Sequence, residues 1–412
     1  MEAVALQVGD ELAVDITRMA HGGSGIGTAP DGRVVFVPGS VPGDSVRVCI
    51  TKVKKRWIRA RLTEVVVPSA HRVPATCPAA RAGAGCCDYS HIDPSVQLRF
   101  KREILLGQLQ ALAQRSGVLA TFDTTNALSC LALEPHHGWR TRVRLGVDDA
   151  GKAGIRRARS HDIIDPSGCM QPVEGLMDRV NTMRFTPGSE VVVARDANGD
   201  RHIVEVETVP RGQARRAETL SRVVEGSGVI TERVGSDEFE FPATAFWQAH
   251  KNAPETYASI IADWGEGEYA RAAAWDLYGG VGAFGPAIAA ATGSTAVHTV
   301  DSSPAATTHQ ATTNRSVHVE AHSGRVEDWI HHLPAPGLVV LDPPRLGAGE
   351  RTVAAIAAAD PERVVHVGCD PSTFSRDLGA WGAAGFRVDR LVLVDAFPNT
   401  HHFETIAQLS RP

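Results

Sequence analysis

The cysteine at position 369 has the setting that most clearly suits chemistry. Cys369 follows the apolar run Arg363–Val367 and precedes an Asp-Pro pair that turns the chain away. In an open α/β sheet, ligands bind at the carboxyl ends of the strands. A thiolate there could add to C6 of a uracil ring, and the otherwise inert C5 carbon could then accept a methyl group. The competing interpretation is a buried cysteine that fills core space, the commoner fate of this residue type.

This chemistry also needs a base, because the C5 proton must leave before the thiol can be eliminated. Glu404 ends the segment Phe397-Pro-Asn-Thr-His-His-Phe-Glu and opens the last apolar stretch of the chain. His401 and His402 are alternative bases, and Glu404 could also be a plain surface glutamate. We predict that Cys369 and Glu404 form the catalytic pair.

A glycine-rich loop between an expected strand and an expected helix predicts a cofactor site. The segment Asp276–Phe284 has glycines at 279, 280 and 282, where the backbone can approach a ligand that a Cβ atom would repel. Asp301 ends the next apolar strand, where a carboxylate can accept hydrogen bonds from ribose hydroxyls. The pattern also suits a plain turn or a dinucleotide, so an NAD-dependent oxidoreductase stays a distant alternative. The segment Asp342-Pro-Pro-Arg345 and the thiol favour a methyl donor.

The elements that would position these residues follow from the hydrophobic pattern. From Ala272 onward, apolar strands alternate with Ala-rich helical stretches, which indicates an α/β domain with a largely parallel sheet. Helical spacing of apolar residues predicts a helix over Phe100–Ser116. The strands expected in the α/β domain are Ala272–Tyr278, Ala296–Val300, Gly337–Leu341, Arg363–Val367 and Val388–Val394.

The first 66 residues indicate a small β-barrel, because short β-type runs alternate with Gly- and Pro-rich turns. Residues 68–93 are expected to be irregular, and residues 138–210 are again β-rich. The strands expected in the barrel are Glu11–Ile16, Arg33–Pro38, Ser45–Val53 and Trp57–Val67.

Composition sets the broad class of protein. The chain has 412 residues, of which 43% are hydrophobic and 22% charged, with a formal net charge of -5. These values indicate a soluble globular protein of two or three domains. We see no secretory signal at the N-terminus and no apolar run long enough to span a membrane. Seven cysteines in an odd, clustered set suit a reducing compartment, so we expect a cytoplasmic location.

Five segments together resemble those of the RNA (uracil-C5)-methyltransferase family. In chain order they are Phe246-Trp-Gln248, Asp276–Gly282, Asp342–Arg345, Cys369-Asp-Pro371 and Phe397–Glu404. The resemblance runs nearly end to end and implies a multidomain protein. The expected protein has a small TRAM- or OB-like β-barrel at 1–66. A cysteine-containing segment and a central β-rich α+β domain would follow at 67–240. A Rossmann-like α/β domain at 241–412 would use S-adenosylmethionine, and a helical part at 96–120 would pack on it.

The resemblance also implies the role of each site residue. Cys369 would be the nucleophile and Glu404 the base. The chain departs from the family at Gly279, Ala283 and Asp370, where Cys, Asn and Asn are common, and the charge of Asp370 would oppose thiolate formation unless it is compensated. The residues expected at the cofactor and target base are Gln248, Tyr278, Gly280, Gly282, Asp301 and Asp342.

Many members of the family carry an iron–sulfur site with four cysteine ligands. Cys77, Cys86, Cys87 and Cys169 fall in the matching regions, although their spacing differs and two of them are adjacent. Four thiolates would suit a [4Fe–4S] cluster or zinc. The alternative is a set of cysteines that bind no metal.

Clusters of basic residues predict that the partner is RNA. Lys52–Arg56 adjoins Trp57 on one expected hairpin, while Arg140, Arg142 and Arg144 alternate along another strand. A third cluster follows nearby and consists of Arg156, Arg157 and Arg159. Basic grooves with an aromatic platform suit single-stranded RNA. We expect a monomer that acts on ribosomal rather than transfer RNA. The alternatives are an amino-group methyltransferase, which needs no thiol, and a catalytically altered family member that only binds RNA.

Overall fold

The computed structural model describes residues 6–411 except 121, 125, 159, 210–217, 294–295, 304–316 and 318. Its N-terminal part is a six-stranded sheet in the order β1-β5-β6-β4-β3-β2. Alternate residues of the long strands point inward, and β1 also contacts β3, so the sheet curls into a small barrel. The strands are β1 (Glu11–Asp15), β2 (Arg18–Met19), β3 (Ser24–Thr28), β4 (Val34–Pro38), β5 (Ser45–Val53) and β6 (Trp57–Val67).

The β2–β3 hairpin is the part of this barrel that the sequence pattern did not predict. We expected residues 22–25 to form only a turn, whereas β3 begins at Ser24 and includes two glycines. A Cβ atom on Gly25 would lie 2.1 Å from Ser40 Oγ, and one on Gly27 would lie 2.2 Å from Val14 Cγ1. Close packing therefore requires glycine inside this strand, and glycine hides the strand pattern.

The central part contains two antiparallel sheets. One has six strands in the order β10-β9-β8-β11-β12-β13, and the other is the hairpin β14–β15. The strands are β8 (Arg142–Val147), β9 (Ala153–Arg156), β10 (Ile163–Ile164), β11 (Glu190–Arg195), β12 (Arg201–Val209), β13 (Glu218–Glu225), β14 (Val229–Val234) and β15 (Asp237–Pro242), with a short 3-10 helix η2 (Val180–Thr182).

The C-terminal sheet has eight strands in the order β18-β17-β16-β19-β20-β22-β21-β7, and β22 is antiparallel to both of its neighbours. The strand order reverses between β16 and β19, which marks the switch point where α/β sheets bind ligands. All five expected strands are present, whereas β7, the edge strand β18 and β22 were not predicted as strands. The strands are β7 (Ser129–Ala132), β16 (Ala273–Leu277), β17 (Val297–Asp301), β18 (Val319–Ser323), β19 (Pro336–Leu341), β20 (Arg363–Gly368), β21 (Arg387–Asp395) and β22 (Glu404–Ser410).

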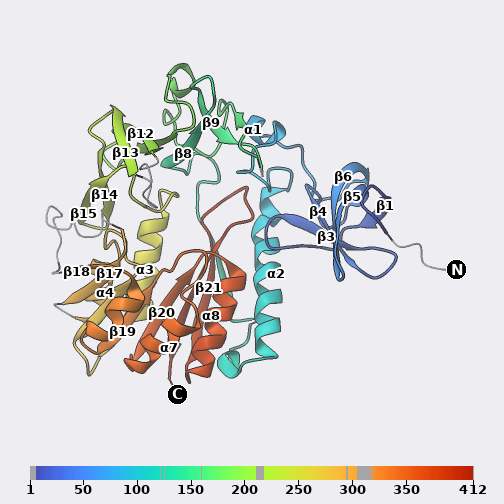
Figure 1. Ribbon diagram of the computed structural model, residues 1–412. Coiled ribbons are helices and arrows are strands. Elements are labelled where there is room, and N and C mark those ends of the chain that lie inside the picture. Colours follow the sequence, from blue (N-terminus) through green and yellow to red (C-terminus); the bar gives the residue numbers. More distant parts are fainter. Residues whose placement is uncertain are drawn as a thin grey trace.

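Helices cover this sheet and link it to the N-terminal part (Figure 1). The long helix α2 stands between the barrel and the C-terminal sheet, where it packs on α8, β7 and β21 and also contacts β2. It begins earlier than expected because Asp93 caps it, with Pro94 in its first turn. The helices are α1 (Pro78–Arg81), α2 (Pro94–Ala113), η1 (Gly117–Leu119), α3 (Ala253–Gly265), α4 (Gly285–Thr292), α6 (Val326–Trp329), η4 (Ile330–His332), α7 (Glu350–Ala358) and α8 (Pro371–Ala383).

None of the helices in the described part of the chain has both the length and the apolar character needed to cross a membrane.

Candidate active site

Cys369 is held between the end of β20 and the start of α8. Asp370 is the N-cap of that helix, and its carboxylate accepts hydrogen bonds from the backbone N–H groups of Ser372 and Thr373. Gly368 lies so close to Phe374 that a Cβ atom there would be 2.5 Å from the ring. The half-buried thiol therefore lies at the carboxyl edge of the sheet in a well-defined position.

The register of β22 brings Glu404 next to Cys369. Gly368 of β20 pairs with Thr405 of β22, so the residues that extend beyond this pair are Cys369 and Glu404. The Glu404 side chain is buried, with 5% of the residue exposed, and its Oε2 atom has no hydrogen-bond partner among the described residues. A buried carboxylate with a free oxygen at this edge is suited to accept a proton.

Asp342 and Arg345 complete the charged surroundings of the thiol. Burial and the negative charges of Glu404 and Asp342 raise the pKa of Cys369 to about 12, and the positive charge of Arg345 opposes this shift. Burial also raises the pKa of Asp342 to about 7, and burial together with the charge of Asp342 raises the pKa of Glu404 well above its usual range. The carboxylates therefore disfavour a thiolate, and Asp370 is not among the main groups that do so.

The loop that carries Glu404 is anchored from helix α2, which the sequence pattern did not reveal. Lys101 Nζ is fully buried and donates hydrogen bonds to Asp395 Oδ1 at 2.6 Å and to the backbone oxygen of Phe397 at 3.1 Å. Gln97 accepts a hydrogen bond from the backbone N–H of Asn399 at 2.9 Å. These three bonds hold the first part of the segment that leads to Glu404, from Asp395 to Asn399.

The two histidines considered as alternative bases have other partners. His401 Nδ1 is paired with Asp88 Oδ2 in a short hydrogen bond. Burial and the charges of His401 and Arg345 lower the pKa of His402 to about 3, and its Nε2 lies 3.5 Å from Arg345 Nη2. Glu404 is therefore the better placed base.

The glycine loop after β16 adopts a conformation that leaves space for a ligand. Gly280 and Gly282 have φ angles of 56° and 76°, and a Cβ atom on Gly280 would meet nothing within 4 Å. The backbone N–H of Gly280 donates to Asp301 Oδ2 at 3.1 Å, so this carboxylate holds the loop from the end of β17. Tyr278 also has a positive φ of 60°, which is uncommon for a residue with a side chain.

One pocket contains four of the six residues expected at the cofactor. Gln248, Tyr278, Gly280 and Asp342 line it together with several aromatic rings, and Gln248 Nε2 lies 3.4 Å from Asp342 Oδ2. Gly282 and Asp301 belong to the same loop network but do not line this pocket. Asp342 lines this pocket and is also close enough to Cys369 for its charge to raise the pKa of the thiol.

Gly279 is explained by the packing under the loop. A Cβ atom there would lie 2.3 Å from Thr299 Oγ1 and 2.5 Å from Asp276 Oδ2. The cysteine that is common in the family at this position would not fit without rearrangement of these two side chains. The glycine at position 279 is therefore consistent with the positions of Thr299 and Asp276, which leave no room for a larger residue.

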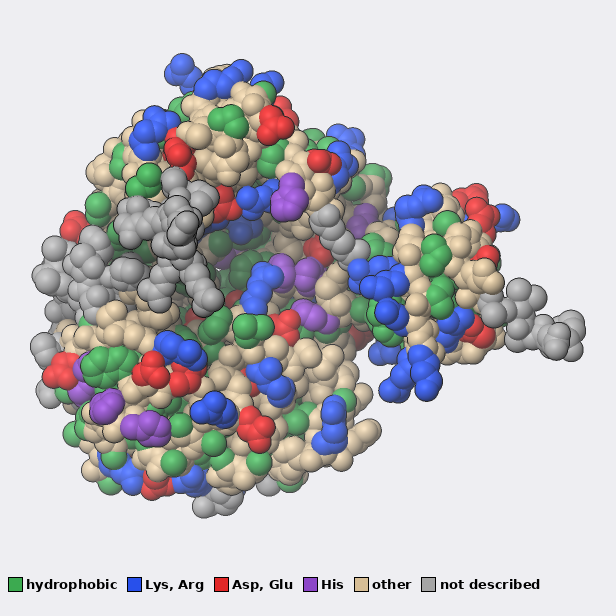
Figure 2. All heavy atoms as spheres, in the orientation of Figure 1, with side chains coloured by type: hydrophobic (Ala, Val, Ile, Leu, Met, Phe, Trp, Pro, Cys, Tyr) green, Lys and Arg blue, Asp and Glu red, His purple; other side chains and the backbone are tan. Residues whose placement is uncertain are grey.

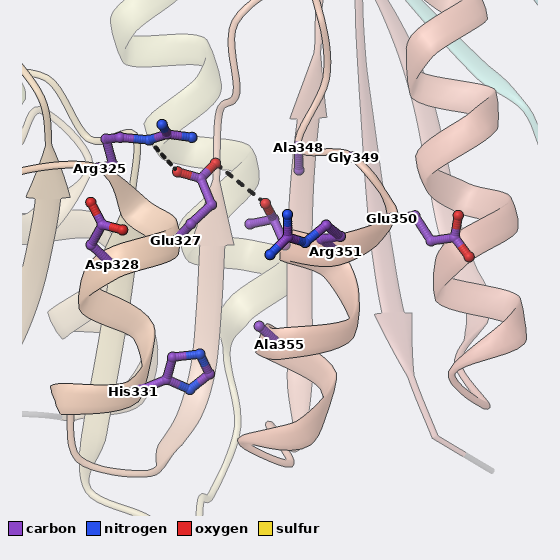
Figure 3. Close-up of a pocket in the computed structure, with 10 residues that line it drawn as sticks. Arg325, Glu327, Asp328, His331, Ala348, Gly349, Glu350, Arg351 and Ala355 are labelled. Atoms are coloured by element: carbon purple, nitrogen blue, oxygen red, sulfur yellow. Dashed lines mark hydrogen bonds and ion pairs between the residues drawn. The ribbon is translucent and has the colours of Figure 1, made fainter.

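A separate hollow of about 620 Å³ lies between α6 and α7 (Figure 3). Glu327 points into it, accepts hydrogen bonds from Arg325 and Thr352, and also receives the hydroxyl of Tyr278 at 3.4 Å. Neither Cys369 nor Glu404 lines this hollow. Glu327 connects the wall of this hollow to the glycine loop, because it accepts the hydrogen bond from the Tyr278 hydroxyl.

The four cysteines predicted as metal ligands come together. The thiols of Cys77 and Cys86 each interact with those of Cys87 and Cys169, although the four span more than 90 residues. Hydrogen bonds from these two neighbours lower the pKa of Cys77 and Cys86. Gln171 Nε2 donates to Cys87 Sγ at 3.2 Å.

The basic clusters of the central part and of the barrel differ in their exposure and in their pairing with other groups. Arg140 and Arg142 are half-buried and donate hydrogen bonds to Gln171 and to the backbone of Ala243, so they do not form the open face that we expected. The matching exposed arginines are paired with carboxylates: Arg144 and Arg156 with Glu190, and Arg157 with Asp162. Arg159, which belongs to the same predicted surface, lies outside the described residues.

The cluster on the barrel remains open to solvent. Lys52, Lys54, Lys55 and Arg56 are exposed beside Trp57, and Lys52 Nζ lies 5.9 Å from the centre of the Trp57 ring. Figure 2 shows Lys and Arg side chains gathered on the barrel, and further Lys, Arg and His side chains in the hollow between the barrel, the central part and the C-terminal domain.

The doubly wound sheet, the glycine-loop pocket at its switch point and the adjacent thiol define a methyltransferase. Comparison with known proteins agrees with this class. The TRAM domain family matches residues 5–63, and the family described as tRNA (Uracil-5-)-methyltransferase matches residues 327–412.

Relatives match over nearly the whole chain. An uncharacterized RNA methyltransferase of Corynebacterium efficiens is 47% identical over 98% of this chain and 96% of the relative. One from Streptomyces coelicolor is 35% identical over 99% of this chain and 94% of the relative. The chain therefore belongs to the RNA (uracil-C5)-methyltransferase family, which uses S-adenosylmethionine, and an NAD-dependent oxidoreductase is excluded.

A solved structure shares the fold of this protein over almost the full length of both chains. The tRNA (uracil-54, C5)-methyltransferase of Pyrococcus abyssi, in complex with S-adenosyl-L-homocysteine, has a TM-score of 0.70 at 22% identity. The match covers 96% of this chain and 99% of that chain. It therefore includes most of the N-terminal barrel as well as the C-terminal domain.

Proposed function

We propose that the protein methylates C5 of a uridine in RNA through a covalent bond between Cys369 Sγ and C6 of the base. The observation that carries the proposal is the register of β20 and β22, which brings the thiol and the buried Glu404 carboxylate to one edge of the sheet. Asp342, whose charge acts on both Cys369 and Glu404, also lines the glycine-loop pocket. A methyl donor bound in that pocket would therefore be close to a uracil ring held at Cys369.

The protein residues act on the uracil ring in a defined order. The Cys369 thiolate bonds to C6, and the electron pair of the C5–C6 double bond moves into the ring carbonyl, which makes C5 nucleophilic. S-adenosylmethionine, which Gln248, Tyr278 and the glycine loop would hold, would supply the methyl group that C5 accepts and would leave as S-adenosylhomocysteine. The Glu404 carboxylate then takes the C5 proton, the double bond re-forms, and the bond to sulfur breaks to restore the thiolate.

Glu404 is well matched to that role. A base with a raised pKa binds a proton more strongly than an ordinary carboxylate, which favours removal of a proton from carbon. Its free Oε2 atom offers a lone pair that no other described group uses. Arg345 lies near both Cys369 and Glu404 and stabilises their negative forms.

The target RNA is the second part of the proposal. Our expectation of ribosomal RNA rests on the barrel, but the transfer RNA enzyme of Pyrococcus abyssi shares the fold over 96% of this chain, so the fold does not distinguish the two targets. The experiment therefore incubates purified protein and labelled S-adenosylmethionine with transfer RNA and ribosomal RNA separately. Methyluridine in one fraction, identified by mass spectrometry, names the target.

Two variants test the mechanism on the active fraction. Cys369→Ala should lose methyl transfer entirely, while Cys369→Ser should bind RNA with unchanged affinity. An amino-group methyltransferase would survive the loss of the thiol. Full activity of Cys369→Ala on uridine would therefore overturn the covalent mechanism.

We further propose that the four cysteines hold a [4Fe–4S] cluster. Their thiols face one another, Cys77 and Cys87 are almost fully buried, and the Gln171 amide donates to a sulfur. Backbone N–H groups of Ala79 and Ala80 also point at Cys77 Sγ, as donors commonly do around cluster sulfurs. Elemental analysis of anaerobically purified protein should give iron and acid-labile sulfide. Zinc, or no metal, would contradict the cluster.

A further inference from the structure

The tip of the β2–β3 hairpin lies on the catalytic loops, far from its own barrel core. His21, in the turn before β3, places Nε2 2.8 Å from Asp370 Oδ2, across 349 positions of the chain. The His21 ring also lies edge-on to His401, with 5.7 Å between the ring centroids. The barrel therefore contributes a side chain to the segment that holds the nucleophile.

The hairpin fits this place closely. Gly23 has a φ of 77°, and a Cβ atom there would lie 2.2 Å from Asp88 Oδ2 and 3.5 Å from His401 Nδ1. Asp88 in turn pairs with His401 on the loop that leads to Glu404. The turn is thus in contact with both catalytic loops, on the Cys369 side through Asp370 and on the Glu404 side through His401.

Asp370 is ionised in this arrangement. Burial acts to raise its pKa, but hydrogen bonds from His21 and from the backbone N–H groups of Thr373 and Ser372 outweigh burial and hold the pKa well below its usual range. One carboxylate oxygen serves the helix N-cap and the other serves His21. Both oxygens are therefore engaged, so the charge that adjoins the nucleophile is compensated.

The thiol can tolerate little more negative charge. Glu404 and Asp342 already disfavour the thiolate, and Arg345 is the cation that opposes them. Asp370 directly follows Cys369 in the chain, so an uncompensated carboxylate at this position would add to the same effect. Without His21, Oδ2 of Asp370 would lose the partner that compensates it.

We propose that His21 is a positioning residue of the active site, which couples the RNA-binding barrel to the nucleophile loop through Asp370. This inference rests on the proposed function, because it concerns the reactivity of Cys369. It assigns to the barrel a second role besides RNA binding. The hydrogen bond from His21 to Asp370 Oδ2 compensates the charge of this carboxylate. Cys369 therefore stays in position and can form a thiolate.

The test measures kcat, KM for RNA and the pH profile of kcat for His21→Ala, in wild type and in an Asp370→Asn background. We expect His21→Ala to lower kcat about tenfold, to leave KM within about twofold, and to shift the rising limb of the profile to higher pH by about one unit. In the Asp370→Asn background the same change should have little effect, since no carboxylate remains to be compensated. His332→Ala, at an exposed position remote from the site, is the matched control.

Two further variants test the hydrogen bond and the docking of the hairpin separately. His21→Gln can still donate to Asp370 and should retain more of kcat than His21→Ala. Gly23→Ala should undock the hairpin and reproduce the loss of kcat, with circular dichroism and thermal unfolding confirming that each variant is folded.

Equal losses from His21→Ala in both backgrounds, or a change confined to KM or to thermal stability, would overturn the proposal. Cys369→Ala is assayed alongside. If that variant stays active, the covalent mechanism itself fails, and this outcome is distinct from a failure of the His21 inference.

Discussion

At the scale of single residues, burial and two nearby carboxylates favour the protonated form of the Cys369 thiol, which is its less reactive form. Burial and the charges of Glu404 and Asp342 raise the pKa of Cys369 to about 12, whereas an unperturbed thiol has a pKa near 8.5. Asp342, with a pKa of about 7, loses its proton before the thiol does. The thiolate is therefore scarce at neutral pH until substrates change the surroundings of Cys369.

This predicts how Cys369 reacts with an alkylating reagent. Its rate of modification by iodoacetamide, followed by mass spectrometry of the Cys369 peptide, should rise about tenfold for each pH unit across the mildly alkaline range, because the thiolate fraction does so well below the pKa. Glu404→Gln should react faster than wild type at alkaline pH, because one of the charges that disfavour the thiolate is gone. A pH-independent rate would mean that the thiolate is already formed.

Glu404 gives a second prediction at this scale. Glu404→Gln can bond to C6 through Cys369 and can methylate C5, but it cannot remove the C5 proton. It should therefore accumulate a protein–RNA adduct that survives denaturing electrophoresis, with turnover reduced by about 10²–10⁴-fold. The double variant Cys369→Ala/Glu404→Gln should give no such band. Normal turnover without an adduct would exclude Glu404 as the base.

At the scale of elements, the glycine loop shows how a departure from a family pattern can be compensated locally. Gly279 has Thr299 and Asp276 directly beneath it, so Gly279→Ala forces contacts of 2.3 and 2.5 Å. We expect that variant to weaken S-adenosylmethionine binding at least about tenfold, as measured by calorimetry. Gly107→Ala is the matched control, because its Cβ atom would meet nothing within 4 Å in helix α2, where alanine favours the helix. Unchanged affinity in Gly279→Ala would show that the loop can shift freely.

The elements also show what sequence patterns can and cannot predict. Periodicity located the strands that precede Gly280, Asp342 and Cys369, because each buried parallel strand is a continuous apolar run that ends in a polar or glycine-rich turn. It could not predict that β22 pairs with β20 and so brings Glu404 to Cys369, since pairing depends on contacts distant in sequence. The anchoring of the base loop by Lys101 was hidden for the same reason.

Charge patterns were informative only where the chain is exposed. Alternating arginines in and just before β8 look the same in the sequence whether they face solvent or the interior. Arg140 and Arg142 are in fact occupied by partners within the central part, while Lys54 and Lys55 on the barrel remain free to bind a ligand. The contact of His21 with Asp370 could not be foreseen, because nothing in either segment indicates that the two meet.

At the scale of the whole molecule, the barrel and the C-terminal domain should contribute to different kinetic constants. Lys54 and Lys55 are exposed at the turn between β5 and β6, in the barrel that lies apart from β20 (Figure 1), and they are suited to contact phosphates. Each phosphate contact releases bound counterions, so the logarithm of the affinity for a single strand falls with the logarithm of salt by about 0.7 per contact. Lys54→Ala/Lys55→Ala should therefore reduce this slope by about 1.4, raise KM for RNA and leave kcat near wild type at saturating RNA. Arg390→Ala, which removes an exposed arginine on β21, should change neither constant.

If the lysine pair lowered kcat with an unaltered salt slope, the barrel would act on the chemistry through these lysines instead of through contact with the RNA backbone.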